Sequence, residues 1–236
     1  MFSEDVFCKG YEIPATIDEA VGLLREKQGR AIIIGGGTDL IPQFRSRSRL
    51  TEYLVDVTRI ASMKTIEFSS GEIVIGGAVT HAEAVASPIV KQYARALALG
   101  CEAVGSPQIR QIATLSGNIV NAQPAADSAV PLIALDAQVH IIGVNGRRAT
   151  PVAETFLGVG QSSIDSSCEL IEKITISPLE ALQGEASDFQ RLACRKALSL
   201  PMVNAAVSLK LVGGRLDWIR IATAPMARYP LRLYEL

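Results

Sequence analysis

The sequence predicts a fold that mixes helices with strands, in one compact domain or in two to three small ones. Capping patterns that begin helices alternate along the chain with short β-branched runs typical of buried strands. Further strand signals come in pairs around glycine-containing turns, as in antiparallel hairpins. The length of 236 residues limits the number of domains.

The first part of the chain carries one helix signal and two strand signals. Thr16 and Glu19 have the spacing of a capping box in front of an apolar stripe, which predicts a helix. The β-branched run Ala31–Ile34 predicts a strand that follows this helix, and the run Tyr53–Val57 predicts another strand that ends the first lobe.

The middle of the chain adds two hairpins, three helices and a further strand. Strands are predicted at Lys64–Phe68 and Glu72–Ile75, at Gln138–Gly143 and Arg148–Thr150, and at Leu170–Ile176. Helices are predicted at Thr80–Ala86, at Ile89–Leu99 after Pro88, and at Ala129–Leu135. The dipeptide Asn145-Gly146 predicts a type I′ turn in the second hairpin.

The last part of the chain predicts a small third lobe. The segment Gln183–Ser187 is polar and contains a glycine, so we expect it to belong to a linker. The runs Val203–Leu211 and Asp217–Ala224 alternate around Gly213-Gly214, which predicts a hairpin. We expect this lobe to be α+β.

A glycine-rich segment follows the strand Ala31–Ile34 directly, in the order Gly35-Gly36-Gly37-Thr38-Asp39-Leu40. Glycines allow the backbone to approach a ligand closely and to adopt positive φ. The alternative is a strand-exit turn that needs glycine only for its geometry. The segment matches neither the Rossmann pattern nor the P-loop pattern, so both of those nucleotide folds are disfavoured.

The segment Gln108–Asp136 contains a second candidate site. It combines a turn of small and polar residues, Thr114-Leu-Ser-Gly-Asn118, with the amide Asn121 and the lone acid Asp127. Backbone amides of such a turn bind phosphate oxygens, and nearby carboxylates or amides bind sugar or ring edges. Together with the glycine-rich segment, it favours a clamp for a diphosphate-containing ligand.

Bulk properties exclude several other classes. The formal net charge of -1 gives no basic surface for nucleic acid, and no apolar stretch has the length of a membrane span. The segment Met1–Val6 lacks the pattern of a signal peptide, so we expect a cytoplasmic protein.

Cysteine and histidine positions indicate no metal site. The cysteines are widely spaced, which favours small, buried, reduced side chains over a zinc or iron–sulfur site. His81 follows Thr80 of a Thr80-x-x-Glu83 capping box and is expected in a first helical turn. His140 lies in an alternating run, where a surface strand position is expected.

Three motifs in this order resemble the FAD-binding (medium) subunit of the molybdenum hydroxylases. They are Gly35-Gly-Gly-Thr-Asp39, Gly105-Ser-Pro-Gln-Ile-Arg110 and Ala113-Thr-Leu-Ser-Gly-Asn118, with Pro124 and Asp127 behind them. The family includes the flavoprotein subunits of xanthine dehydrogenase and of aerobic carbon monoxide dehydrogenase. The resemblance runs from about Tyr11 to about Pro225, and the stretch from Asn121 to Ala129 leans toward the xanthine dehydrogenase-like branch.

The resemblance implies an α+β fold with a two-lobed FAD-binding domain of the PCMH (vanillyl-alcohol oxidase-like) type. Residues 1–58 would form its first lobe and residues 59–178 its second, with FAD between them. Residues 185–236 would form the C-terminal lobe. In the family that lobe continues into further helices, so here it looks shortened.

The resemblance also implies a set of cofactor-binding residues. They are Ile32, Ile33, Ile34, Gly35, Gly36, Gly37, Thr38, Asp39, Leu40, Ala113, Thr114, Leu115, Ser116, Gly117, Asn118, Asp127, Leu170 and Arg191. The backbone amides of the first segment would face the diphosphate, and the Thr114 hydroxyl would donate to a phosphate. Asp127 would accept from the adenosine or ribityl side. The Leu170 backbone would approach the adenine, and Arg191 would stand near the flavin.

One residue departs from the family pattern, and two have plain structural alternatives. Ser116 occupies a position where the family usually has glycine, which would cost about 1 kcal/mol if positive φ were needed there. Asp127 could cap the following helix instead of binding a ligand. Arg110 could be an ion-pair partner in the second lobe.

The implied function is electron transfer through FAD, with no catalytic acid, base or nucleophile supplied by this chain. In the family, a molybdopterin-containing large subunit hydroxylates the substrate, and a small subunit with [2Fe–2S] clusters passes electrons to FAD. FAD then reduces NAD, a quinone or O₂. Two alternatives remain open, a self-sufficient flavoprotein oxidoreductase and a degenerate, FAD-free scaffold subunit.

Overall fold

The computed structural model describes residues 8–46, 48, 50–195 and 199–234. The expectation about a signal peptide concerns Met1–Val6 and lies outside these residues. The expectation of a shortened end concerns the chain up to Leu236, whose last two residues also lie outside them.

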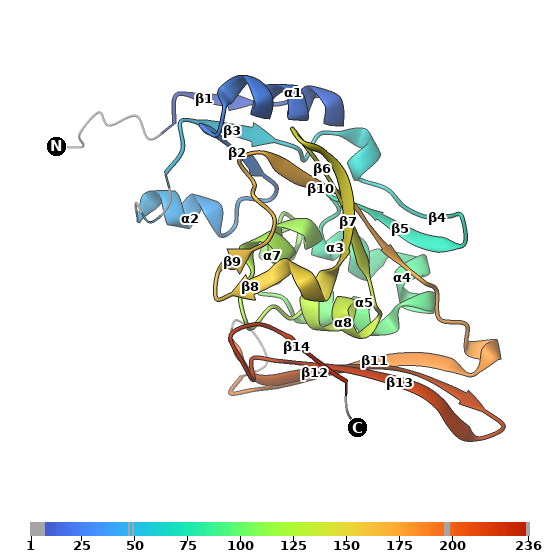
Figure 1. The fold of residues 1–236 in the computed structure, drawn as a ribbon. Helices are drawn as coiled ribbons and strands as arrows, with labels where there is room; N and C mark the ends of the chain where they lie inside the picture. Colours follow the sequence, from blue (N-terminus) through green and yellow to red (C-terminus); the bar gives the residue numbers. More distant parts are fainter. Residues whose placement is uncertain (1–7, 47, 49, 196–198, 235–236) are drawn as a thin grey trace.

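Three main sheets follow one another through the molecule, with helices between the second and the third (Figure 1). The α-helices are α1 Ile17–Lys27, α2 Leu40–Arg45, α3 His81–Ala86, α4 Pro88–Tyr93, α5 Arg95–Ala103, α6 Pro107–Arg110, α7 Leu115–Asn121 and α8 Ala129–Ala134. The strands are β1 Gly10–Glu12, β2 Ala31–Ile34, β3 Tyr53–Asp56, β4 Ile66–Ser69, β5 Glu72–Gly76, β6 Gln138–Gly143, β7 Gly146–Pro151, β8 Phe156–Gly158, β9 Gln161–Ser162, β10 Glu169–Ile176, β11 Glu185–Ala193, β12 Pro201–Val212, β13 Arg215–Ala224 and β14 Leu231–Leu233. Short 3₁₀ helices are η1 Ala61–Met63, η2 Val152–Thr155 and η3 Ala181–Gln183.

The first sheet is small and parallel, with the order β1-β3-β2. Helix α1 packs on it with Ala20, Val21 and Leu24 buried. Thr16 begins this helix, because its side chain accepts a hydrogen bond from the backbone N–H of Glu19 at 3.2 Å. The packing of α1 and the pairing with β3 fix the end of β2, and the glycine-rich segment begins there.

The second sheet is antiparallel, with the order β4-β5-β10-β6-β7. Strand β10 lies at its centre although it is the last of the five in sequence. Its apolar residues Ile171, Ile174 and Ile176 join the main core, which also receives apolar side chains from helices α5, α7 and α8. This core holds the start of α7 at the edge of the pocket described below.

The third sheet is antiparallel, with the order β11-β12-β13-β14. Helices α5 and α8 lie between it and the second sheet (Figure 1). Two buried serine hydroxyls join the third sheet to these helices. Ser208 Oγ donates to the carbonyl of Ala134 in α8 at 2.6 Å, and Ser187 Oγ accepts from the N–H of Ala96 in α5 at 3.1 Å. The third sheet is thus fixed against the core, so its loops can contribute to the pocket.

The prediction of one helix over Ile89–Leu99 is wrong, because the structure has two helices, α4 and α5. The chain breaks at Ala94, with φ -144° and ψ 48°. A continuous helix would engage the Tyr93 carbonyl and the Ala96 N–H internally. Instead the Tyr93 carbonyl accepts from Leu179 at 3.0 Å, and the Ala96 N–H donates to Ser187. Partners distant in sequence therefore end α4.

Other predicted details also differ from the structure. The Asn145-Gly146 turn is not type I′, because that type needs positive φ at both residues and only Gly146 has it, at 115°. The predicted linker Gln183–Ser187 is too long, because β11 begins at Glu185. In the third lobe, the described residues from 185 onward form strands and turns without a helix, so its α+β character is not observed there.

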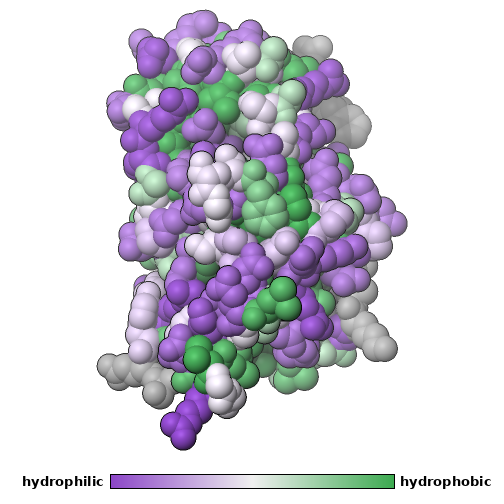
Figure 2. Space-filling view, turned by 90° about the vertical axis from the view of Figure 1, so that its right-hand side faces the viewer, coloured by the Kyte–Doolittle hydropathy of each residue, from purple (hydrophilic) through white to green (hydrophobic). Residues whose placement is uncertain are grey.

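None of the described helices combines the length and the apolar character that crossing a bilayer requires. Figure 2 shows a largely hydrophilic face with hydrophobic residues in separate patches. The prediction of buried cysteines holds only for Cys101, since Cys8 and Cys168 are half-buried and Cys194 is exposed.

Candidate functional site

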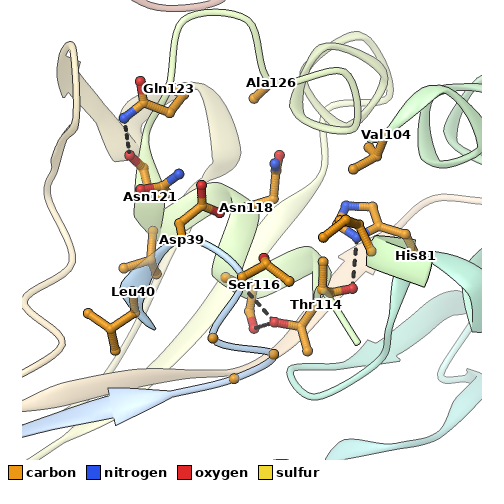
Figure 3. Close-up of a pocket in the computed structure, with 18 of the residues that line it drawn as sticks. Asp39, Leu40, His81, Val104, Thr114, Ser116, Asn118, Asn121, Gln123 and Ala126 are labelled. Atoms are coloured by element: carbon orange, nitrogen blue, oxygen red, sulfur yellow. Dashed lines mark hydrogen bonds between the residues drawn. The ribbon is translucent and has the colours of Figure 1, made fainter. Parts of the chain in front are cut away.

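A cavity of about 770 Å³ opens where the first and second sheets meet the loops of the third. Its size is in the range of cofactor and ligand pockets. The glycine-rich segment after β2 forms one wall, and the start of α7 with the following loop forms another. In Figure 3, Asp39 from the first wall and Thr114, Ser116 and Asn118 from the second surround the same space.

The structure brings nearly all of the predicted site residues to this cavity. Those that line it are Ile32, Ile33, Ile34, Gly35, Gly36, Gly37, Thr38, Asp39, Leu40, Ala113, Thr114, Ser116, Gly117, Asn118, Asp127 and Leu170. Two do not line it. Leu115 is fully buried in the main core, and its N–H donates to the carbonyl of Val79. Arg191 lies behind the wall, where it pairs with Asp127.

The glycine-rich segment presents unused backbone donors to the cavity. Within the described residues, the consecutive backbone N–H groups from Gly36 to Leu40 have no protein acceptor. Gly37 has φ 67°, a conformation that favours glycine. These residues are half-buried, except Asp39, which is exposed, and all of them line the cavity. Consecutive backbone N–H groups that no protein group uses favour a ligand rich in acceptor oxygens.

Gly35 and Gly36 are required because the two walls touch. A Cβ at Gly36 would lie 1.8 Å from the carbonyl oxygen of Ile112, and a Cβ at Gly35 would lie 2.7 Å from Thr114 Oγ1. The glycines therefore allow the first segment to pack directly on the second. This is a more specific reason than the strand-exit turn considered from the sequence.

The second wall is the start of a helix, so the prediction of a turn at Thr114–Asn118 is wrong. Thr114 is the N-cap of α7, and its Oγ1 accepts from the N–H of Gly117 at 3.1 Å. Thr114 Oγ1 also lies 3.5 Å from Ser116 Oγ, a long contact to which the Thr114 hydroxyl can donate. The backbone N–H of Ser116 has no acceptor among the described residues, so it is available to a ligand. The Thr114 hydroxyl becomes available when it turns from Ser116 toward the ligand.

Ser116 fits its position without strain. It lies in the first turn of α7, and its φ is not positive, so the predicted penalty for replacing glycine does not arise. The Ser116 Oγ donates to the carbonyl of Gly77, so the single hydrogen of this hydroxyl is used within the protein. The Ser116 hydroxyl can therefore only accept from a ligand.

Asp127 joins the cavity to the third sheet. Its Oδ1 accepts from Arg191 Nε at 3.0 Å and from Asn204 Nδ2 at 2.8 Å. Burial raises the pKa of this carboxyl, while Asn204 and Arg191 favour its ionised form. The alternative of a helix cap is wrong, because the N-cap of α8 is Ser128, without a side-chain capping bond.

Other lining residues were not assigned to the site from the sequence. They include His81, Val104, Asn121, Gln123, Ala126, Ser199, Pro201 and Pro225. Asn121 lay within a singled-out segment, but residues from Ser199 onward carry no local signal, because only the packing of the third sheet brings them here. Arg110, considered as an ion-pair partner, instead donates to the carbonyl of Val104 at 2.9 Å.

Fold and pocket together define an FAD-binding oxidoreductase domain. The chain belongs to the family described as "FAD binding domain in molybdopterin dehydrogenase", whose model matches residues 5–179. This confirms the predicted resemblance, the mixed fold class and FAD as the cofactor.

Individual relatives agree with this family. The nicotinate dehydrogenase FAD-subunit of Eubacterium barkeri is 30% identical, and the match covers 94% of this chain and 76% of that protein. The carbon monoxide dehydrogenase medium chain of Hydrogenophaga pseudoflava is 29% identical, over 94% of this chain and 76% of that one. Among solved structures, carbon monoxide dehydrogenase of the same organism superposes with a TM-score of 0.88, at 29% identity over 94% of this chain and 76% of that chain.

Proposed function

We propose that the chain binds FAD across this cavity and transfers electrons as one subunit of a molybdenum hydroxylase. The observation that carries the proposal is the row of free backbone N–H groups from Gly36 to Leu40, joined by the N–H of Ser116 across the cavity. The diphosphate would accept from these groups, and the Thr114 hydroxyl would add one more donor.

The composition of the walls fits an anion held by backbone rather than by cations. Among the described residues that line the cavity, the carboxylates are Asp39, Asp127 and Glu169, and there is no lysine or arginine. The negative charge of the diphosphate must therefore be stabilised by neutral backbone N–H donors. The carboxylates can accept from the hydroxyl groups of FAD, which is the role we propose for Asp127 through its second oxygen.

Arg191 has a positioning role in this proposal. It holds Asp127 from behind, and its Nη2 donates to the carbonyl of Ser199, which lines the cavity. Bound FAD supplies redox chemistry, and no residue of this chain is needed as a proton donor or acceptor for the organic substrate. We retain Leu170, at the start of β10, as a backbone neighbour of the adenine.

We further propose that residues 1–58 and 59–178 are the two lobes that enclose FAD, and that residues 185–236 form a third unit. Both proposed lobes supply lining residues. The proposed partners are a molybdopterin-containing large subunit and a [2Fe–2S] small subunit, since relatives are named as an FAD-subunit and a medium chain. NAD is the proposed acceptor, with a quinone or O₂ as alternatives, and the proposed location is the cytoplasm.

The visible spectrum of the purified chain tests this proposal. We expect flavin absorption bands in near-equimolar amount, and recovery of these bands when the stripped protein is mixed with FAD. A folded, colourless protein that rejects added FAD would favour the FAD-free scaffold. Turnover of an organic substrate by the isolated chain would favour the self-sufficient oxidoreductase.

The electron acceptor is tested separately. After reduction with dithionite and removal of the excess, NAD, a soluble quinone and O₂ are offered in turn, and the rate of flavin reoxidation is followed. We expect NAD to reoxidise the flavin. Reoxidation by the quinone or O₂ alone contradicts the NAD assignment and leaves the FAD assignment intact.

A further inference from the structure

His81 braces the second wall of the cavity. It is fully buried at the first position of α3, and it lines the cavity. Its backbone N–H and its ring Nδ1 both contact the carbonyl oxygen of Ala113, at 3.0 and 2.8 Å. Together with the bond from the Leu115 N–H to the carbonyl of Val79, at 3.1 Å, these contacts fix the start of α7 against α3.

The position of the ring proton follows from these partners. A carbonyl oxygen only accepts, so Nδ1 of His81 must carry a hydrogen toward Ala113. Burial, with a smaller contribution from the nearby Arg110 guanidinium, lowers the pKa of His81 to about 4, although the hydrogen bond to Ala113 acts in the opposite direction. The ring is therefore neutral near pH 7, and Nε2 has a lone pair and no hydrogen.

The other ring nitrogen of His81, Nε2, contacts the hydroxyl of Ser128, which also contacts Asn118. Ser128 Oγ lies 3.1 Å from Nε2 of His81 and 2.9 Å from the side-chain amide of Asn118, where Oδ1 faces it. A hydroxyl has only one hydrogen, and here two acceptors compete for it. Both contacts are satisfied if the amide of Asn118 turns by half a rotation, which exchanges its oxygen and nitrogen.

We propose that His81, acting through Ser128, fixes the Asn118 amide with its oxygen toward the cavity. In this arrangement Asn118 Nδ2 donates to Ser128 Oγ, Ser128 Oγ donates to His81 Nε2, and His81 Nδ1 donates to the Ala113 carbonyl. Each of the three contacts then joins one donor to one acceptor. The oxygen of Asn118 is left facing the ligand as an acceptor.

This assignment determines what Asn118 can recognise. An acceptor repels phosphate oxygens and selects a hydroxyl or an N–H group. The ligand identity rests on the proposed function: in FAD such donors are the ribityl and ribose hydroxyls and the amino and imino groups of the rings. Asn118 then belongs with the sugar and ring contacts, whereas the backbone N–H groups hold the diphosphate.

Nitrogen NMR of the full chain labelled with ¹⁵N-histidine tests the proton positions directly. At pH 7 we expect His81 to show a protonated Nδ1 and an unprotonated, hydrogen-bonded Nε2. In Ser128→Ala, the Nε2 signal should move toward the position of a free lone pair. Ser128 makes no side-chain capping bond, so this variant removes the hydroxyl without removing a cap.

Affinity for FAD gives the second measurement. Ser128→Ala leaves the Asn118 amide free to rotate, and we expect the dissociation constant to rise about threefold to tenfold. His81→Asn keeps a donor toward Ala113 but removes the Nε2 acceptor, and should give a similar rise. His140→Asn is the matched control, because His140 contacts Thr175 away from the cavity, and it should bind FAD as the unaltered chain does.

A protonated Nε2 at pH 7 overturns the proposal, and so does unchanged FAD affinity in Ser128→Ala. Failure of the unaltered chain to bind FAD is a different outcome. It contradicts the proposed function, while the NMR signals of His81 still decide the orientation of Asn118.

Discussion

Gly36→Ala adds one methyl group at the closest contact between the two walls of the cavity. The new Cβ would lie 1.8 Å from the Ile112 carbonyl oxygen, and real Cβ contacts are not shorter than 3.0 Å. The backbone must therefore shift by at least 1.2 Å, the difference between these distances. The obstacle is backbone on both sides, so no side-chain rotation relieves it.

The expected effect is a large loss of FAD affinity. A shift of this size takes the N–H groups of the segment out of hydrogen-bonding range of the diphosphate. Losing two bonds to a charged acceptor, at about 1.5–3 kcal/mol each, weakens binding by at least about a hundredfold. Overpacking should also lower the free energy of unfolding by about 1–3 kcal/mol.

The assay is titration of the stripped protein with FAD, followed by the quenching of flavin fluorescence, with circular dichroism as the check of folding. Gly22→Ala is the matched control, because Gly22 lies within α1 and its added Cβ meets no atom within 4 Å. That control should bind FAD normally and gain about 0.5–1 kcal/mol of stability. If Gly36→Ala binds FAD as tightly as Gly22→Ala, the proposed clamp is wrong.

Three further predictions concern stability. Asp127→Ala leaves Arg191 buried without its counter-charge and should lower the free energy of unfolding in urea by about 3–5 kcal/mol; a loss below about 1 kcal/mol would show that the pair is not the link to the third sheet. Burial lowers the pKa of His81 to about 4, so the neutral ring contributes fully to the free energy of unfolding above pH 6.5, and up to about 3 kcal/mol of it is lost as the pH falls toward 4. In His81→Asn, the free energy of unfolding should depend less on pH between 6.5 and 4. An unchanged pH dependence in that variant contradicts a buried, neutral His81. Burial and the hydrogen bond to Asp56 raise the pKa of Tyr11 to about 12, so the free energy of unfolding should fall as the pH rises from 10 to 12. Tyr11→Phe should lack the part of this fall that comes from ionisation of the phenol. If Tyr11→Phe shows the same fall, the loss of stability comes from another group.

Features that depend on neighbouring residues in sequence were predictable. The capping residues Thr16 and Thr80 begin helices as expected, because each side chain accepts from a backbone N–H only three positions further along the chain. The hairpin around Gly213-Gly214 also forms, with both glycines at positive φ. The cavity walls were found in the same way, since a row of glycines is itself a local signal.

Features set by distant partners were not predictable. Ala94 carries no helix-breaking signal, and the break depends on a hydroxyl of β11 that only tertiary packing brings near. The pairing of Arg191 with Asp127 joins residues far apart in sequence, so the sequence alone does not indicate that Arg191 contacts an acid that lines the cavity. His81 carried only a helix signal in the sequence, and its contact with Ser128 joins it to the N-cap of another helix, α8.

The difference between backbone and side-chain contacts explains how relatives of about 30% identity can share one cofactor site. The proposed diphosphate contacts use backbone N–H groups, so the sequence must keep only the residues that let the backbone approach, above all Gly35 and Gly36. Positions whose side chains face the cavity can vary as long as they leave those groups free. Ser116 is such a position, because its hydroxyl donates to the Gly77 carbonyl and its own N–H has no acceptor among the described residues. A substitution that introduced a side-chain acceptor for these N–H groups should therefore reduce FAD binding more than one that changed the shape of the wall.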